Sequence, residues 1–554
     1  MRDLLPGLAT NPALPPELVD RLIAHALGSA PTATEGTAHD VAPGAGGPDG
    51  TGPAGSDVPD RDDREDPEDR EDPEDREWLA SRLAGREGLR RDQALLLAAH
   101  DEPLGVHLAY GGNLDAADVD PAVWPAAALA LLDEGAGAPW WAALLAAHPN
   151  PERRVKLAGC PGLPAGVGAT LAADPELDVA VELAAWGTPD AEAAALLVAH
   201  PHAEVRRAVA ANEAVPPALL AALLTGEGLR PASSCLVCDD EATPFTHDPE
   251  CPRPDCLLRA GAACDGSHQS TVHETWQAAL TNPATPTDAV LRFAGHPSAL
   301  LRLAVAGRAG LPPEVYARLA RDPVPGVRWD VAGNPDAGEA LIRELAAGPD
   351  PDTRQALLRN PRVPLDVLAR LARGTGFGRE PLPRIAAASP AEVRELAASA
   401  DAGLRVLVAL RRDLPPDVRD ALAADPDAKV VKAVAAHPGL GEDRLRAAVA
   451  RFGVQVLAQV AANPDAPGAL LEDIARHDPP VRRALRTVAE HPHATGPALL
   501  TCLAHEKARR YAAAHPALPT AALLALLDGP DRYVAEVAAA NPALPTAAMR
   551  KLMP

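Results

Sequence analysis

The stretches DPVPGVRWDVAGN, residues 322–334, and NPRVPLDVLARLAR, residues 360–373, contain the two patterns that decide the fold. In the first, a boundary pair such as Asp-Pro leads through V-R-x-x-V-A to a final Asn or His. In the second, Asn-Pro leads through another proline to a run of Leu, Val and Ala. Apolar residues at i and i+4 predict one buried stripe on a short helix in each pattern.

Boundary pairs of this kind recur along almost the whole chain, in steps that alternate between 14 and 12 residues in the best-ordered run. The repeating unit is therefore about 26 residues long, with a longer and a shorter half. Helices of about eight residues are unstable alone in water, so we expect each one to be held by its neighbours. The sequence predicts an all-α fold, a right-handed α-solenoid of two-helix repeats whose shorter half is a short α- or 3₁₀-helix.

These patterns resemble the leucine-rich repeat variant family, whose units alternate an α-helix with a shorter helix, often 3₁₀, and contain no strands. HEAT-like helical pairs are the alternative, because the two repeat types have similar short motifs. The resemblance covers most of the chain outside residues 29–76 and 228–272. It implies a stack of helices that offers an extended surface to a partner.

Breaks in the repeat divide the chain into parts. Residues 29–76 are rich in Gly, Pro, Ala and Thr and then run into REDPED twice, so we expect a disordered, self-repelling acidic linker. The linker separates an isolated first repeat, which either docks on the main array or caps nothing. A glycine-rich stretch, RGTGFGR at 373–379, lengthens one unit. The expected parts are a first repeat at 1–28, the linker at 29–76, repeats at 77–227, a cysteine-rich insert at 228–272 and repeats at 273–554.

Charge and composition restrict the function. The net charge is −24, and residues 57–77 alone contain 13 acidic residues and four arginines, which leaves about −15 for the rest. Such a chain repels nucleic acid and anionic membranes, so the expected partner is a protein or peptide. The chain lacks an apolar run of membrane-spanning length and an apolar run like that of a signal peptide at its start. With seven clustered cysteines, these features favour a cytoplasmic, reduced protein.

The insert contains five of the seven cysteines. Cys235-x2-Cys238 can place two thiolates of one turn on a metal ion, and Cys251-x4-Cys256 can complete a tetrahedron. The substitute ligands are Cys264, His247 and His268. We expect zinc in a structural site, with a 4Fe-4S cluster as the alternative, since four thiolates suit both. Some members of the resembled family have a four-cysteine iron–sulfur module beside their repeats, but there it is N-terminal. A disulfide, a CxxC redox pair and buried free thiols remain open. Cys160 and Cys502 occupy ordinary repeat positions, where we expect packing residues.

The V-R position of the shorter half places an arginine at regular intervals. Arg302, Arg328 and Arg354 are 26 residues apart, and Arg154 and Arg206 follow the same period around Ala180. Stacking would align these arginines in a column on one surface. The column either binds carboxylates or phosphates of a partner, or of the acidic linker, or pairs with acidic residues of the adjacent turn.

No catalytic motif stands out in the sequence, and six histidines that precede proline at repeat boundaries are expected to be architectural. These are His148, His200, His296, His437, His491 and His515. The favoured function is therefore a non-catalytic scaffold. A metal or redox sensor coupled to the repeats, and an enzyme of the helical-repeat lyase kind, are the alternatives.

Overall fold

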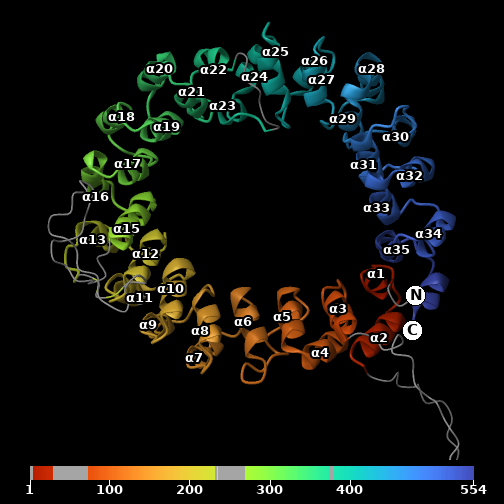
Figure 1. Cartoon of the computed structure of the whole chain (residues 1–554), viewed down its shortest axis with the longest axis horizontal. Coiled ribbons are helices and arrows are strands. Elements are labelled where there is room, and N and C mark those ends of the chain that lie inside the picture. The colour runs from red at the N-terminus through yellow and green to blue at the C-terminus, as the bar shows by residue number, and fades with distance from the viewer. Residues whose placement is uncertain (1–3, 29–72, 231, 233, 235–268, 373–379) are drawn as a thin grey trace, which may run out of the picture. The chain divides into compact units, whose positions relative to one another are not determined.

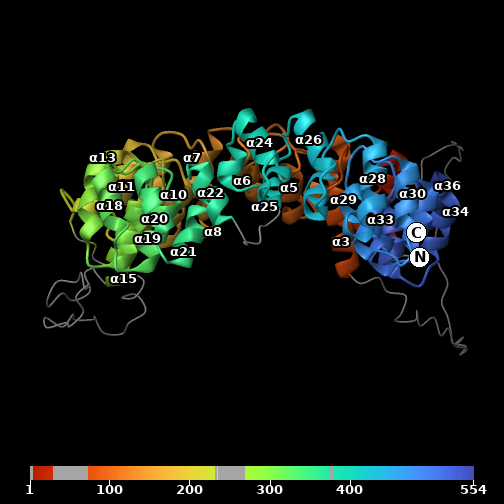
Figure 2. The same cartoon turned by 90° about the horizontal axis from the view of Figure 1, so that it is seen from above.

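The computed structural model describes residues 4–28, 73–230, 232, 234, 269–372 and 380–554. These residues are helical and contain no strand, which confirms the all-α class (Figures 1 and 2). The described helices fall into two compact units. Unit 1 comprises Met1–Asn113 and Leu518–Pro554, and unit 2 comprises Leu114–Ala517. None of the described helices is both long and apolar enough to cross a membrane.

Unit 2 consists of two rows of short helices, and successive helices within a row contact one another along much of each row. The short-half row, most of which lies on the inside of the unit's curve in Figure 1, comprises α6 (Pro125–Asp133), α8 (Pro151–Ala158), α10 (Leu177–Trp186), α12 (Ala203–Ala211), α15 (Gln269–Thr281), α17 (Ala299–Ala306), α19 (Pro325–Gly333), α21 (Pro351–Leu357), α23 (Pro383–Ala386), α25 (Ala402–Ala409), α27 (Ala428–Val434), α29 (Leu457–Ala461), α31 (Arg482–Glu490) and α33 (Glu506–Ala514). The long-half row comprises α7 (Trp141–Ala146), α9 (Val167–Ala172), α11 (Ala191–Val198), α13 (Pro217–Thr225), α16 (Thr287–Leu291), α18 (Pro313–Leu319), α20 (Glu339–Ala347), α22 (Leu365–Leu371), α24 (Pro390–Ala397), α26 (Pro416–Ala423), α28 (Glu442–Phe452), α30 (Gly468–Ala475) and α32 (Gly496–Leu503).

Proline and a short polar side chain together start many of these helices. In α21 the first residue is Pro351, whose missing N–H costs nothing there, and the Asp350 side chain accepts a hydrogen bond from the Asp352 N–H. The short halves are mainly α-helical. Two 3₁₀ segments occur among the described residues, η3 (Arg292–Gly295) after α16 and η4 (Gly453–Gln455) between α28 and α29. The 3₁₀ form is therefore not the rule in the shorter half.

A ladder of buried side chains joins each repeat to the one before it. The Asn334 amide donates to the carbonyls of Ala306 and Arg308, 28 and 26 residues earlier, at 3.0 and 2.7 Å. The same contact, to two carbonyls of the preceding repeat, is made by the side chains of Asn212, Asn282, Arg308, Asn360, Arg411 and Asn463. Each rung satisfies carbonyls that end a helix and that burial would otherwise leave unpaired.

Unit 1 brings the two ends of the chain together. Its helices are α1 (Leu5–Ala9), α2 (Pro16–Ala26), α3 (Pro73–Ala84), α4 (Arg91–His100), α5 (Glu102–Tyr110), α34 (Thr520–Leu527), α35 (Arg532–Ala539) and α36 (Thr546–Leu552). The Asn11 amide donates to the carbonyls of Ala539 and Asn541 at 2.9 and 2.8 Å. Arg86 in turn donates to the carbonyls of Ala9 and Asn11. The first repeat therefore takes the place of the next repeat after the last one.

Candidate functional site

The metal ligands expected from the sequence, Cys235, Cys238, Cys251, Cys256, Cys264, His247 and His268, all lie outside the described residues. The described part of the chain contains no group of three or more His, Cys, Asp or Glu that could hold a metal ion. The repeats on either side of the insert contact each other directly. Asn282, in the first repeat after it, donates to the carbonyls of Ala210 and Asn212, in the last repeat before it. The stacking contact therefore continues across the insert.

The arginine column lies on the short-half row, and Arg302 shows its geometry. Its guanidinium donates through Nε and Nη2 to both carboxylate oxygens of Asp322, at 2.7 and 3.0 Å. Its Nη1 donates to the backbone carbonyls of His296 and Pro297, both at 2.8 Å. The Arg302 side chain is only 12% exposed and that of Asp322 only 7%. One arginine thus binds the boundary pair that begins its own short half, His296 and Pro297, and the boundary residue that begins the next short half, Asp322.

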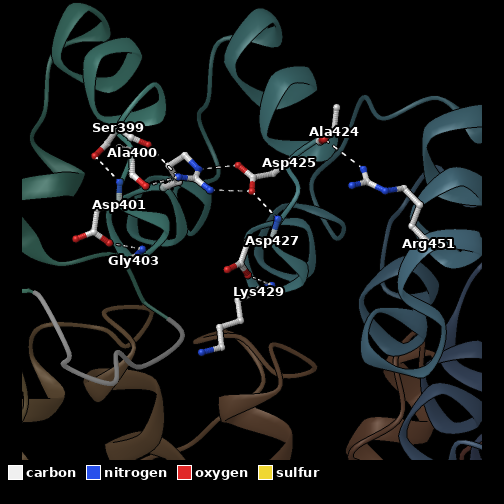
Figure 3. Close-up of polar contacts among 10 residues, drawn as sticks. Ser399, Ala400, Asp401, Gly403, Ala424, Asp425, Asp427, Lys429 and Arg451 are labelled. Atoms are coloured by element: carbon white, nitrogen blue, oxygen red, sulfur yellow. Dashed lines mark hydrogen bonds and ion pairs between the residues drawn. The ribbon is translucent and has the colours of Figure 1, made fainter.

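Two more arginines repeat this clasp, meaning the two-point Arg–Asp contact with its carbonyl bonds. Arg154 binds Asp174 at 2.7 and 3.0 Å, and Arg405 binds Asp425 at 2.7 and 3.1 Å. Figure 3 shows Asp425 in this contact, where it also accepts from the Asp427 N–H. In all three clasps the aspartate lies 20 residues after the arginine. Sequence reasoning missed Arg405, although the 20-residue Arg-to-Asp spacing would have identified it.

The remaining arginines of the column have other partners. Arg206 donates to the carbonyls of Ala199, His200 and Arg230, and burial lowers its pKa. Arg328 donates to the carbonyls of Asp322 and Pro323 and lies 3.5 Å from a carboxylate oxygen of Asp350. Arg354 donates to the carbonyl of Pro349 at 3.4 Å. Each expected column residue therefore has a partner within its own chain.

The clasps also fix the charge state of their carboxylates. The hydrogen bonds from Arg302 hold the pKa of Asp322 below its ordinary value. At Asp174 and Asp425, burial works against ionisation, but the arginine and a backbone N–H together still lower the pKa. Each pair therefore stays ionised at neutral pH, and the guanidinium charge is locally neutralised. Binding of a separate partner by these arginines stays a prediction.

Three of the boundary histidines, His437, His491 and His515, and the two remaining cysteines are buried in the stack, whereas His148, His200 and His296 are partly exposed. His491 contacts the carbonyl of Asn463 through Nε2 at 2.8 Å, and His515 contacts that of His491 at 3.0 Å, so both take the place of a ladder asparagine. His437 is 1% exposed, and burial lowers its pKa to about 4. Cys160 and Cys502 are fully buried, and burial raises their thiol pKa to about 12 and about 11. Neither thiol is placed as a nucleophile.

No protein-family model matches this sequence, and comparison with curated proteins gives no significant match.

Proposed function

We propose that the chain is a non-catalytic scaffold, a right-handed α-solenoid of about 26-residue repeats of the leucine-rich repeat variant kind. In this proposal a partner protein or peptide binds along the short-half row of unit 2. Stacked repeats offer one continuous surface, because each unit contacts only its neighbours and repeats the same orientation. A function in protein binding needs no active-site cavity, only a surface whose side chains are held in register.

The observation that carries the proposal is the repetition of the clasps and rungs along one row. Arg154, Arg302 and Arg405 bind their aspartates with nearly the same distances in three separate places. A clasp fixes the spacing of adjacent short halves, and a rung fixes the depth at which one repeat packs on the next. The side chains that these contacts leave on the surface are therefore presented at regular positions, which favours recognition of an extended partner.

Site-specific photo-crosslinking tests which row binds. A benzoylphenylalanine in place of Leu300, a half-exposed residue of α17, samples the short-half row. The matched positions in the long-half row are Leu196 in α11 and Leu500 in α32, which are similarly exposed. We expect a discrete protein adduct in the native cells from position 300 and none from 196 or 500. Adducts from the long-half row alone, or from all three positions equally, would exclude the short-half row as the binding surface.

We further propose that the insert holds one structural metal ion through Cys235, Cys238, Cys251 and Cys256, with zinc as the expected ion. Direct contact between the flanking repeats supports a local role, because the stack does not need the insert to continue. Elemental analysis of aerobically and anaerobically purified chain should find equimolar zinc in both. Iron with a visible absorption band would instead support the cluster and a sensor function. A Cys238→Ser chain that retains its full metal content would contradict this ligand set.

A further inference from the structure

A hollow with a strong positive charge lies on the short-half row between α31 and α33. It encloses about 590 Å³ and is lined by Arg482, Arg483, Arg486, Glu506, Lys507, Arg510 and Tyr511. Five of these seven side chains are cationic and one is acidic. The whole chain has a net charge of −24, so this hollow opposes the general field of the molecule. A local concentration of one charge sign focuses the field on ligands of the opposite sign.

The cations occupy matching positions on the two helices. Arg483 and Lys507 are 24 residues apart, as are Arg486 and Arg510, and the same step separates the ladder histidines of the two repeats. Because α31 and α33 pack directly on each other, these positions form two parallel rows. The Arg486 and Arg510 guanidinium carbons each lie 4.5 Å from the centre of the Tyr511 ring. The ring therefore anchors one cation from each helix.

Three of the cations are available to a ligand. Arg486 binds Glu490 through Nε at 3.0 Å, and Glu506 is the one carboxylate that lines the hollow. Within the described part of the chain, Arg482, Arg483 and Lys507 have exposed side chains with no hydrogen-bond or ion-pair partner. Their mutual repulsion destabilises the empty surface, so an anionic ligand gains more there than at an isolated charge.

We propose that this hollow docks an acidic peptide segment of the partner protein, and this inference rests on the proposed function. Neighbouring helix axes are about 8–10 Å apart, and an extended peptide rises about 3.3 Å per residue. Carboxylates at i and i+3 would thus reach cations on both helices, where guanidinium groups bind carboxylates in a two-point contact. Tyr511 is already engaged by two guanidinium groups, which disfavours the base stacking that single-stranded nucleic acid uses.

The test is fluorescence anisotropy on the full chain with a labelled acidic peptide. The sequence DVPDRDDREDPEDRED of residues 57–72 is a suitable probe, and its Asn/Gln counterpart is the neutral control. The test variant is Arg483→Gln with Lys507→Gln. The matched control is Lys429→Gln with Lys432→Gln, which removes two exposed lysines of α27 outside the hollow. We expect the Kd of the acidic peptide to rise about tenfold in the test variant and to stay within twofold in the control.

Other results would overturn the inference. Equal weakening in both double variants would show general charge attraction, and no binding to the wild-type chain would show that the hollow takes no acidic peptide. Tighter binding of a single-stranded oligonucleotide of equal charge would assign the hollow to nucleic acid. In a further variant, Asn and Gln replace the acidic residues of 57–72. If this variant binds the probe much more tightly than the wild type does, the hollow is the site of the chain's own acidic segment. If the photo-crosslinked adduct from position 300 persists when Arg483 and Lys507 are both replaced by Gln, the partner binds the short-half row without using the hollow. The proposed function would then stand and this inference would fall.

Discussion

Replacing Asn11 with alanine should loosen the contact between the first and last repeats of unit 1. The Asn11 side chain is fully buried, and its amide donates to the carbonyls of Ala539 and Asn541 at 2.9 and 2.8 Å. Alanine removes both donors and leaves two buried carbonyls unpaired, at about 1–2 kcal/mol each. The local free energy of opening should therefore fall by about 2–4 kcal/mol, which raises the open population roughly 30-fold or more.

Hydrogen exchange measured by mass spectrometry is the suitable assay, because stability in a repeat array is local and a long array does not unfold in one two-state transition. Peptides that cover α1 and α35 should exchange faster in Asn11→Ala, and peptides of unit 2 should not. Asn360→Ala is the control, since it removes the same pair of bonds, to Ala332 and Asn334, inside unit 2. Unchanged protection of α1 and α35, with faster exchange in α19 and α21 of the control, would refute the claim that this rung holds the first repeat.

Two further predictions concern charge. Asp322→Asn should destabilise α17 and α19 by about 1–3 kcal/mol in hydrogen exchange, because Arg302 loses an ionised partner. Because the pKa of Asp322 is lower in the folded chain than its unfolded value of about 4, ionised Asp322 stabilises the fold above that pH. This stabilisation is lost as the pH falls through the folded pKa, so the stabilities of variant and wild type should converge in acid. His437→Asn should remove a pH dependence. Because the folded pKa of His437 is about 4, the wild-type protection of α27 in hydrogen exchange should fall between about pH 6.5 and 4, by about 2–3 kcal/mol, whereas the variant should lack this component. Equal slopes in the two chains would contradict that reasoning.

The sequence predicted the helical class, because that class depends on local patterns. The boundary asparagines have two roles, and in the first of them the Asn212 side chain accepts from the Ala214 N–H at 2.9 Å. Their second role was not predicted. The Asn212 amide also donates to Ala184 and Gly187 of the preceding repeat, and a periodic pattern does not show which carbonyls lie across the stack.

Two features, one at the candidate site and one in the fold, were not predicted, and the causes differ. Arg405 was missed because it lies 51 residues after Arg354, one residue short of two 26-residue periods, so a strict 26-residue count passes over it. The docking of the first repeat was left open because the contact partner of Asn11 lies more than 500 residues away in the chain. Sequence spacing contains no information about such a contact. A ladder asparagine binds two backbone carbonyls of another repeat, and its sequence does not show which repeat provides them.

The column arginine and the residue that follows it make different contacts, and this difference affects how the surface can recognise a partner. Column arginines such as Arg302 bind backbone carbonyls and an aspartate of the next boundary, so changing them alters stacking. The residue that follows the column differs between repeats, and so do its contacts. Trp329 donates to a carboxylate oxygen of Asp350 in the next repeat and Arg486 lies over the Tyr511 ring, whereas Lys432 is exposed on α27. These side chains are partly or fully exposed. Where this side chain is exposed, as at Lys432, recognition can change without a change in the stack. A substitution there should move the binding preference while leaving hydrogen-exchange protection of the ladder intact.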